Sequence, residues 1–133
     1  MIYTLDTNAL TALLLGRGGF GKRFEDVLSK GHVLTLNAVS YYELKRGLTL
    51  PRFSRRLSQF ETFLTQYESL PMNTEALDVA VGIYQTLRAD GTLLEDADIF
   101  MAAIAIAHDA TLVTRNLKHF ERIDGLKLET WEA

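Results

Sequence analysis

The first ten residues, "MIYTLDTNAL" (1–10), place the carboxylate of Asp6 directly after a short apolar run that favours a β-strand. A helical pattern, "TNALTALLLG" (7–16), follows at once. Asp is a common helix N-cap, so capping alone would explain Asp6. However, a strand that leads straight into a helix is also the unit from which α/β sheets are built, and such sheets bind ligands beyond the carboxyl ends of their strands. The junction therefore predicts both a fold class and a place for chemistry.

The same alternation of strand and helix continues along the chain. Between the strand-like runs lie helical patterns, among them "VSYYELKRGL" (39–48) and the almost wholly apolar "DADIFMAAIAIAHD" (96–109). We therefore expect a three-layer α/β/α fold, in which helices cover both faces of a central parallel sheet of four to five strands. The expected strands are residues 2–5, 32–36, 67–72, 110–114 and 126–131.

Length and composition indicate one domain over residues 1–133. The chain is 47% hydrophobic, has a formal charge of -3 and contains no cysteine. These values argue against a disordered polyelectrolyte, a broadly basic nucleic-acid coat, disulfides and thiolate metal sites. The longest apolar run, "IFMAAIAIA" (99–107), is far shorter than the ~20 residues of a membrane span, and no signal peptide is recognisable. We expect a soluble, cytoplasmic protein with no membrane partner.

Further acids lie near other strand-to-helix or loop-to-helix junctions. Glu43 has a structural explanation in an S-x-x-E capping box with Ser40, and acids at 95–98 would complement a helix dipole. Together, however, Asp6, Glu43 and Asp98 would meet at one edge of an α/β sheet, where carboxylates repel one another unless a cation lies between them. Oxygen ligands without cysteine favour Mg²⁺, or Mn²⁺, over zinc.

Asp96 and Asp98 cannot both face one cation from within a helix, because two residues turn their side chains about 200° apart. We therefore expect Asp96 to be the N-cap and the less favoured metal ligand, while Asp98 points at the ion.

A fourth junction follows the run 110–114. Thr114 ends it, and Asn116 is expected either to cap a short helix or to act as a weak ligand or partner of bound water. Three cations near the acids, Arg115, Lys45 and Arg46, are candidates for phosphate contacts, although such charges are more often simply solvated.

Histidine and aromatic side chains are expected to be structural. His32, His108 and His119 are not placed with the acids by any local pattern, and placement is the first requirement of a catalytic base. Three aromatic residues are candidates for stacking on bases but fit a core or interface better: Tyr41, Tyr42 and Trp131.

Three segments in this order carry a family resemblance. "LDTNAL" (5–10), "NAVSYYELKRG" (37–47) and "EDADIFMAAIAIAHDATLVTRNLKHFERIDGLKLETW" (95–131) resemble PIN-domain ribonucleases of the VapC toxin type, over essentially the whole chain. The resemblance implies an acidic cluster that binds divalent metal and cleaves RNA phosphodiesters. By position, Asp6, Glu43 and Asp98 match the catalytic and metal-binding acids.

The resemblance also implies roles for neighbouring residues and partners. Asn8, Thr114 and Asn116 match positions near substrate or water; many PIN domains carry Asp where this chain has Asn116, which bears on a second metal ion. A homodimer is implied, as is a cognate antitoxin whose basic C-terminal segment places an Arg among the carboxylates. A small open reading frame immediately upstream that encodes a DNA-binding fold with a basic C-terminal tail would support the toxin interpretation.

Other functions also place an Asp after a first strand. A phosphoryl-transfer domain of the haloacid dehalogenase type needs a second acid where this chain has Asn8, and a receiver domain needs a middle phosphoacceptor Asp that "SLPMN" (69–73) does not offer. A PIN scaffold that only binds RNA or protein would be expected to have lost acids of the cluster.

Overall fold

The computed structural model is described for residues 1–131. Within these residues five strands form one sheet in the order β3-β2-β1-β4-β5, and every neighbouring pair is parallel. β1 lies at the centre, and the chain adds strands first on one side of it and then on the other. The strands are β1 (Ile2–Leu5), β2 (Val33–Asn37), β3 (Ser69–Leu70), β4 (Ala110–Val113) and β5 (Lys127–Glu129).

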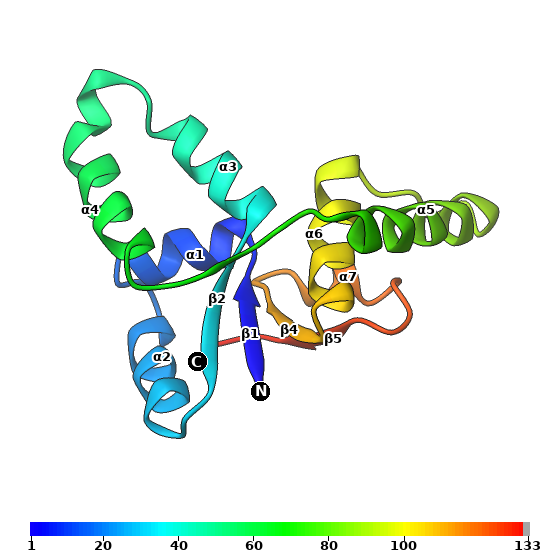
Figure 1. Ribbon diagram of the computed structural model, residues 1–133, viewed down its shortest axis with the longest axis horizontal. Helices are drawn as coiled ribbons and strands as arrows, with labels where there is room; N and C mark the ends of the chain where they lie inside the picture. Colours follow the sequence, from blue (N-terminus) through cyan, green and yellow to red (C-terminus); the bar gives the residue numbers. More distant parts are fainter. Residues whose placement is uncertain (132–133) are drawn as a thin grey trace.

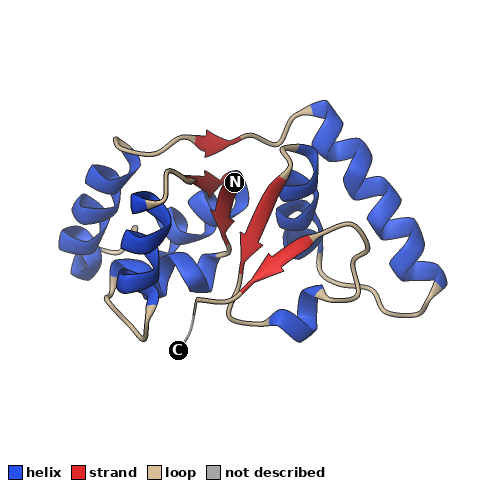
Figure 2. Ribbon diagram, turned by 90° about the horizontal axis from the view of Figure 1, so that it is seen from below, coloured by secondary structure: helices blue, strands red, loops and turns tan. Residues whose placement is uncertain are grey.

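Helices cover both faces of this sheet, as Figures 1 and 2 show. One face carries α1 (Thr7–Leu14), α2 (Phe20–Ser29) and α4 (Ser54–Leu64), and the other carries α5 (Thr74–Ala89), α6 (Asp96–Ala107) and α7 (Leu117–Phe120). The helix α3 (Ala38–Gly47) contributes side chains to both cores, and a short 3₁₀ turn, Pro51–Phe53, precedes α4. The expected three-layer α/β/α fold is confirmed.

Strand side chains alternate between two hydrophobic cores because successive residues of a strand point to opposite faces. Leu5 and Val113 pack beneath α1, α2 and α4, whereas Ala110 and Leu112 pack beneath α5 and α6. The apolar helix α6 is buried along most of its length, which explains why its sequence shows no polar face.

Buried polar groups connect the sheet to the helices at its carboxyl edge, the edge formed by the carboxyl ends of the strands. The Ser40 hydroxyl of α3 donates to the Leu5 carbonyl at 2.7 Å, and the Asp6 amide donates to the Val113 carbonyl at 2.9 Å. Asn37 accepts from the Val39 amide as the N-cap of α3, and its amide donates to the Met101 carbonyl of α6 at 3.0 Å. These contacts fix the positions of four elements at the carboxyl edge of the sheet: β1, β4, α3 and α6.

Several predicted boundaries shift for local reasons. The third strand is only Ser69–Leu70, because Pro71 has no amide hydrogen to donate to a neighbouring strand. The predicted capping box is wrong: Asn37 caps α3, so Ser40 lies inside the helix and bonds to the sheet instead. No helix in residues 1–131 combines the length and apolarity needed to cross a bilayer.

Asn37 should contribute more to stability than an ordinary cap. Asn37→Ala removes a fully buried side chain with hydrogen bonds to two helices, whereas Asn73→Ala removes only the exposed cap of α5. We expect Asn73→Ala to lower the free energy of unfolding by about 1 kcal/mol and Asn37→Ala by roughly 2–4 kcal/mol, since a buried partner is also left unpaired. Urea titrations measure both values, and equal losses would contradict the second role of Asn37.

Candidate active site

A polar cleft of about 340 Å³ opens at the carboxyl edge of the sheet, where β1 ends between the beginnings of α1 and α6 and the middle of α3. In Figure 1 the arrowhead of β1 points toward this region. The strand order changes direction beside β1 and β4, which is where open α/β sheets form ligand crevices. The cleft is lined by Asp6, Thr7, Asn8, Glu43, Arg46, Asp98 and Met101. The three acids expected to converge do so here.

Asp6 forms the floor of the cleft and is only 7% exposed. Its carboxylate accepts from the Ala9 amide at 2.7 Å and so also caps α1, which confirms the capping prediction. Burial raises the pKa of Asp6, and the nearby charge of Asp98 raises it further; hydrogen bonds from Thr114 and Ala9, and the charge of Arg115, act in the opposite direction. The net effect is a raised pKa, so the fold disfavours the charged form of this acid.

Glu43 reaches the cleft from the second turn of α3. Its carboxylate accepts from the Thr7 hydroxyl at 2.5 Å, a contact between residues 36 positions apart that no local pattern predicts. Arg46, one turn further on, also lines the cleft, and its guanidinium lies 5.1 Å from the centre of the Tyr42 ring. Lys45 is directed elsewhere, because its ammonium lies against the ring and hydroxyl of Tyr41. Of the predicted phosphate contacts on α3, only Arg46 is in the cleft.

Asp98 is the third residue of α6 and lies at the opposite wall. Asp96 is exposed and is not among the cleft-lining residues. The prediction that Asp96 caps α6 is wrong: the helix begins one residue earlier, Glu95 is the N-cap, and the Glu95 side chain makes no capping bond. The separation of the two acids is nevertheless as expected, since Asp98 alone faces the cleft.

His119 overturns one expectation. Its Nε2 lies 2.8 Å from Oδ2 of Asp98, so this histidine is placed with the acids. The turn after β4 folds α7 back over the beginning of α6, and a separation of 21 residues conceals the contact in the sequence. The other two histidines lie elsewhere, as expected: His32 contacts the amino terminus, and His108 contacts the Pro71 carbonyl.

The segment after β4 stabilises the acids through hydrogen bonds from outside the cleft. Thr114 is fully buried, bonds to Asp6 and accepts from the Asn116 amide at 2.9 Å. The Asn116 side chain caps α7 by accepting from the His119 amide at 3.3 Å, and it does not line the cleft. Asn8 does line the cleft and is exposed.

The three aromatic residues considered for base stacking differ in their exposure. Trp131 is buried in the core, Tyr41 packs on Phe60, and Tyr42, at 59% exposure, has its ring against the Arg46 guanidinium.

The donor chemistry of the cleft suits a hard divalent cation. Within residues 1–131 no three His, Asp or Glu side chains are close enough to hold one ion between them. Mg²⁺, however, usually keeps several waters and takes only one or two carboxylates from the protein. The neighbouring acids Asp6 and Asp98, with Glu43 lining the same cleft, are compatible with that mode of binding. Burial is the main cause of the raised pKa of Asp6, and a cation would relieve the additional repulsion from Asp98.

Comparison with known proteins agrees with this geometry. Ribonuclease VapC2 of Rickettsia felis is 28% identical to this chain over 133 residues, which cover 99% of both chains. The tRNA(fMet)-specific endonuclease VapC of Salmonella typhimurium is 34% identical over 77 residues, which cover 58% of each chain. A crystal structure of VapBC2 from Rickettsia felis, bound to a DNA fragment from its promoter, contains a chain that superposes with a TM-score of 0.91 at 27% identity, covering 99% of this chain and all of that one. The PIN domain family model matches residues 3–126. The chain therefore belongs to the PIN domain family.

Proposed function

We propose that this chain is an endoribonuclease that depends on a divalent metal ion and acts as the toxin of a toxin–antitoxin pair. The observation that carries the proposal is the convergence of Asp6, Glu43 and Asp98, from three separate elements, in one polar cleft. Membership of the PIN family and similarity to proteins named ribonuclease VapC support it. Because its substrate is RNA, we place the activity in the cytoplasm.

Asp6 and Asp98 are the proposed ligands of Mg²⁺, for which Mn²⁺ is a plausible substitute. When bound, such an ion supplies an activated water and neutralises charge on the phosphate oxygens. Glu43, held by the Thr7 hydroxyl, orients the attacking water by accepting a hydrogen bond from it. Thr114 and the Ala9 amide fix the carboxylate of Asp6, so that its oxygens need not reorganise during the reaction.

Substrate phosphates are proposed to contact Arg46, which lines the cleft beside the acids. The Tyr42 ring lies beside the Arg46 guanidinium, which limits the freedom of this long side chain before RNA binds. Arg115 moderates the negative charge of Asp6 from the β4 side, and Asn8, exposed at the mouth, is available to substrate or water.

Family membership excludes the haloacid dehalogenase and receiver alternatives. A PIN scaffold without activity is disfavoured, because all three principal acids are retained and each has a hydrogen-bond donor from the protein.

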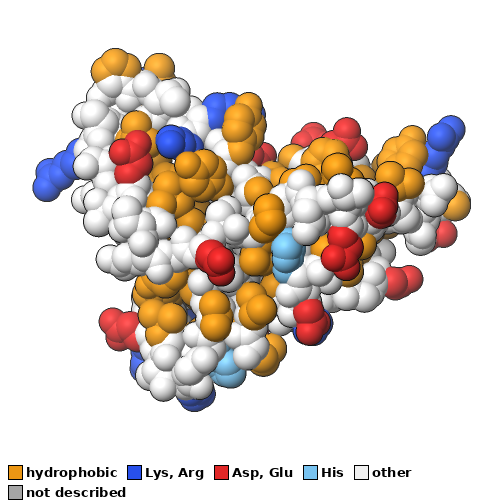
Figure 3. Space-filling view, viewed as in Figure 1, with side chains coloured by type: hydrophobic (Ala, Val, Ile, Leu, Met, Phe, Trp, Pro, Cys, Tyr) orange, Lys and Arg blue, Asp and Glu red, His pale blue; other side chains and the backbone are white. Residues whose placement is uncertain are grey.

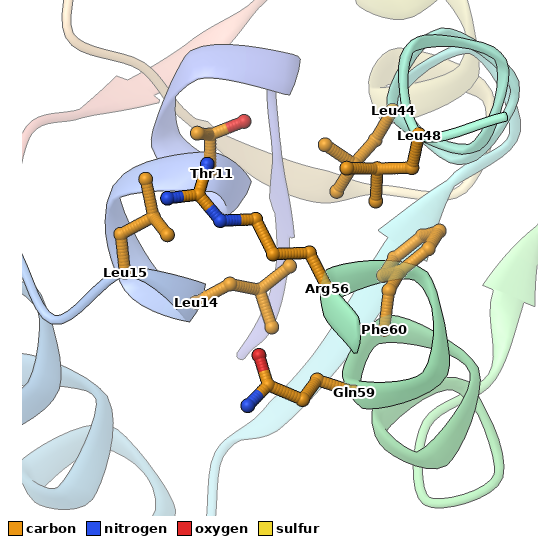
Figure 4. A pocket seen from close by; sticks show the side chains of 8 residues that line it. All are labelled: Thr11, Leu14, Leu15, Leu44, Leu48, Arg56, Gln59 and Phe60. Atoms are coloured by element: carbon orange, nitrogen blue, oxygen red, sulfur yellow. The ribbon is translucent and has the colours of Figure 1, made fainter. Parts of the chain in front are cut away.

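An apolar groove is the proposed docking surface for the antitoxin. Figure 4 shows Leu14 and Leu15, at the end of α1, on one side of this groove and Leu44 and Leu48, at the end of α3, on the other. Phe60 of α4 lines it as well, and the Arg56 side chain of α4 extends between the two sets of leucines. The same two helices, α1 and α3, carry acids or partners of the cleft, so a segment lying in this groove is close in the fold to the active site. A basic C-terminal segment could then place an Arg among the carboxylates and exclude metal and substrate. The similarity to VapC chains solved in VapBC complexes supports an antitoxin as the occupant.

A second apolar surface is proposed to form a homodimer. Leu77, Val81 and Tyr84 recur at helical spacing on α5 and are 44%, 58% and 40% exposed. Figure 3 shows hydrophobic side chains along the part of the molecule that α5 occupies in Figure 1. Large apolar side chains in a row on an exposed helix face are typical of an interface between protein chains.

Removing either ligand acid should abolish RNA cleavage. We expect Asp6→Asn and Asp98→Asn to lower kcat/KM by more than the roughly 10–100-fold that follows the loss of an outer-shell partner. Asp96→Asn is the matched control, because it makes the same chemical change two residues away, outside the cleft, and should leave activity within a few-fold of the parent. Cleavage of a labelled RNA, with and without chelator, measures all three. Full activity in Asp98→Asn would exclude the proposed site.

The raised pKa of Asp6 predicts a pH-dependent gain in stability on neutralisation. An acid whose pKa is raised by folding contributes most below its unfolded value, near 3.8, and that contribution is lost as the pH rises through its folded pKa. Asn keeps the cap of α1 without the charge. In chelator, Asp6→Asn should therefore gain stability relative to the parent between pH 3 and pH 7.

Denaturant unfolding of both proteins across this pH range tests the prediction. Asp26 and Asp109, whose pKa values are lowered chiefly by Lys30 and Lys127 respectively, are present in both proteins and cancel in the difference. If the stability of Asp6→Asn relative to the parent stays constant, or falls with rising pH, then folding does not raise the pKa of Asp6.

Single substitutions that introduce a charge should show that the two apolar surfaces serve different interactions. Leu48→Glu in the groove is expected to weaken antitoxin binding by at least about tenfold and to leave the dimer intact, because it buries a carboxylate against leucines. Val81→Glu on α5 should dissociate the dimer and leave antitoxin binding unchanged. Light scattering of each variant, alone and mixed with the cognate antitoxin, measures both properties. A parent that is monomeric at micromolar concentration would rule out the dimer.

A further inference from the structure

His119 is a polar side chain beside the cleft, in contact with Asp98, for which the proposed reaction has assigned no role. Its Nε2 lies 2.8 Å from Oδ2 of Asp98, and both side chains are about 30% exposed, at 31% and 29%. Because the carboxylate of an ionised Asp is only an acceptor, Nε2 must be the donor, whatever the state of the other ring nitrogen.

The ring of His119 is held from more than one side. Its backbone amide bonds to Oδ1 of Asn116, the cap of α7, and the ring packs edge-on against the buried ring of Phe120, with 5.1 Å between the ring centres. The chain segment that carries His119 is itself held by the hydrogen bond from the Asn116 amide to the Thr114 hydroxyl. A donor supported in this way holds its acceptor in one orientation.

The three acids of the cleft share one arrangement. Asp6 accepts from Ala9 and Thr114, Glu43 accepts from Thr7, and Asp98 accepts from His119. Oδ2 of Asp98 is thus engaged by the protein, and Asp98 itself lines the cleft. Partners of this type orient ligating carboxylates, and their loss commonly costs 10–100-fold in metal affinity.

We propose that His119 is a positioning residue of the active site, which fixes the carboxylate of Asp98 for a divalent cation by donating a hydrogen bond from Nε2 to Oδ2. The inference rests on the proposed function, since it assumes that Asp98 binds the ion. It also gives Asn116 a role: its side chain caps the turn that presents His119, and it would affect a bound ion only through His119 and Asp98.

Titration of the purified, metal-free full chain with Mn²⁺, followed calorimetrically at one neutral pH, tests the proposal. His119→Ala should raise the Mn²⁺ dissociation constant by about 10–100-fold. His119→Gln, whose amide offers a donor at a similar reach, should recover most of the affinity. His108→Ala is the matched control, because the His108 ring bonds to the Pro71 carbonyl outside the cleft, and it should bind Mn²⁺ like the parent.

RNA cleavage separates positioning from a general loss of structure. At saturating Mn²⁺ His119→Ala should recover most of its kcat, with an unchanged KM for RNA, because only the placement of Asp98 is impaired. If His119→Ala does not fold, His119→Phe takes its place, since it keeps a ring against Phe120 and lacks the donor.

The possible failures can be distinguished. Parental Mn²⁺ affinity in a folded variant without the donor, combined with lost affinity in Asp98→Asn, would overturn the role of His119 and leave the proposed function intact. A parent chain that neither binds Mn²⁺ nor cleaves RNA would overturn both.

Discussion

The buried carboxylate of Asp6 is the constraint on which the arrangement of the active site depends. An ionised group with 7% exposure is stable only when it is well hydrogen-bonded or paired. Here the Ala9 amide, the Thr114 hydroxyl and the charge of Arg115 stabilise it, while burial and Asp98 oppose its ionisation. The protein therefore keeps two carboxylates near one another at a cost to folding, and the cation proposed above would offset that cost.

The topology explains why this carboxylate lies where it does. β1 is the central strand, with β2 on one side and β4 on the other, so the residue after β1 lies at the point where the sheet changes direction. The Asp6 amide continues the pairing with β4 through the Val113 carbonyl, and Ser40 binds the last carbonyl of β1. The backbone around Asp6 is thus fixed by both neighbouring elements, and α3 and α6 bring Glu43 and Asp98 to the same cleft.

Local patterns in the sequence predict much of this. Strand-like runs separated by helical ones predict the α/β/α fold. Asp6 and Asp98 stand out because each lies at the beginning of a helix, and Glu43 because it follows the second strand within the next helix. The same local reasoning fails for Ser40, whose pairing with Glu43 depends on where α3 begins. Because Asn37 is the N-cap, α3 begins earlier than the capping box predicts. Ser40 then bonds to the Leu5 carbonyl, and Glu43 accepts from the Thr7 hydroxyl. The predicted cap of α6 is also displaced by one residue, since Glu95 holds the N-cap position in place of Asp96 and its side chain makes no capping bond.

The donors that position the acids lie beyond the reach of such reasoning. Thr7 meets Glu43 across 36 residues and His119 meets Asp98 across 21, so neither contact leaves a periodic trace in the chain.

The central claim is that the convergent acids make this PIN domain a metal-dependent ribonuclease. The most direct measurement incubates the purified chain with total RNA, in Mg²⁺ or in chelator, and sequences the ends that appear. The account predicts a reproducible set of new ends in Mg²⁺ that is absent in chelator and absent from Asp98→Asn purified in parallel. The same ends appearing in chelator, with protein free of contaminating nucleases, would contradict it.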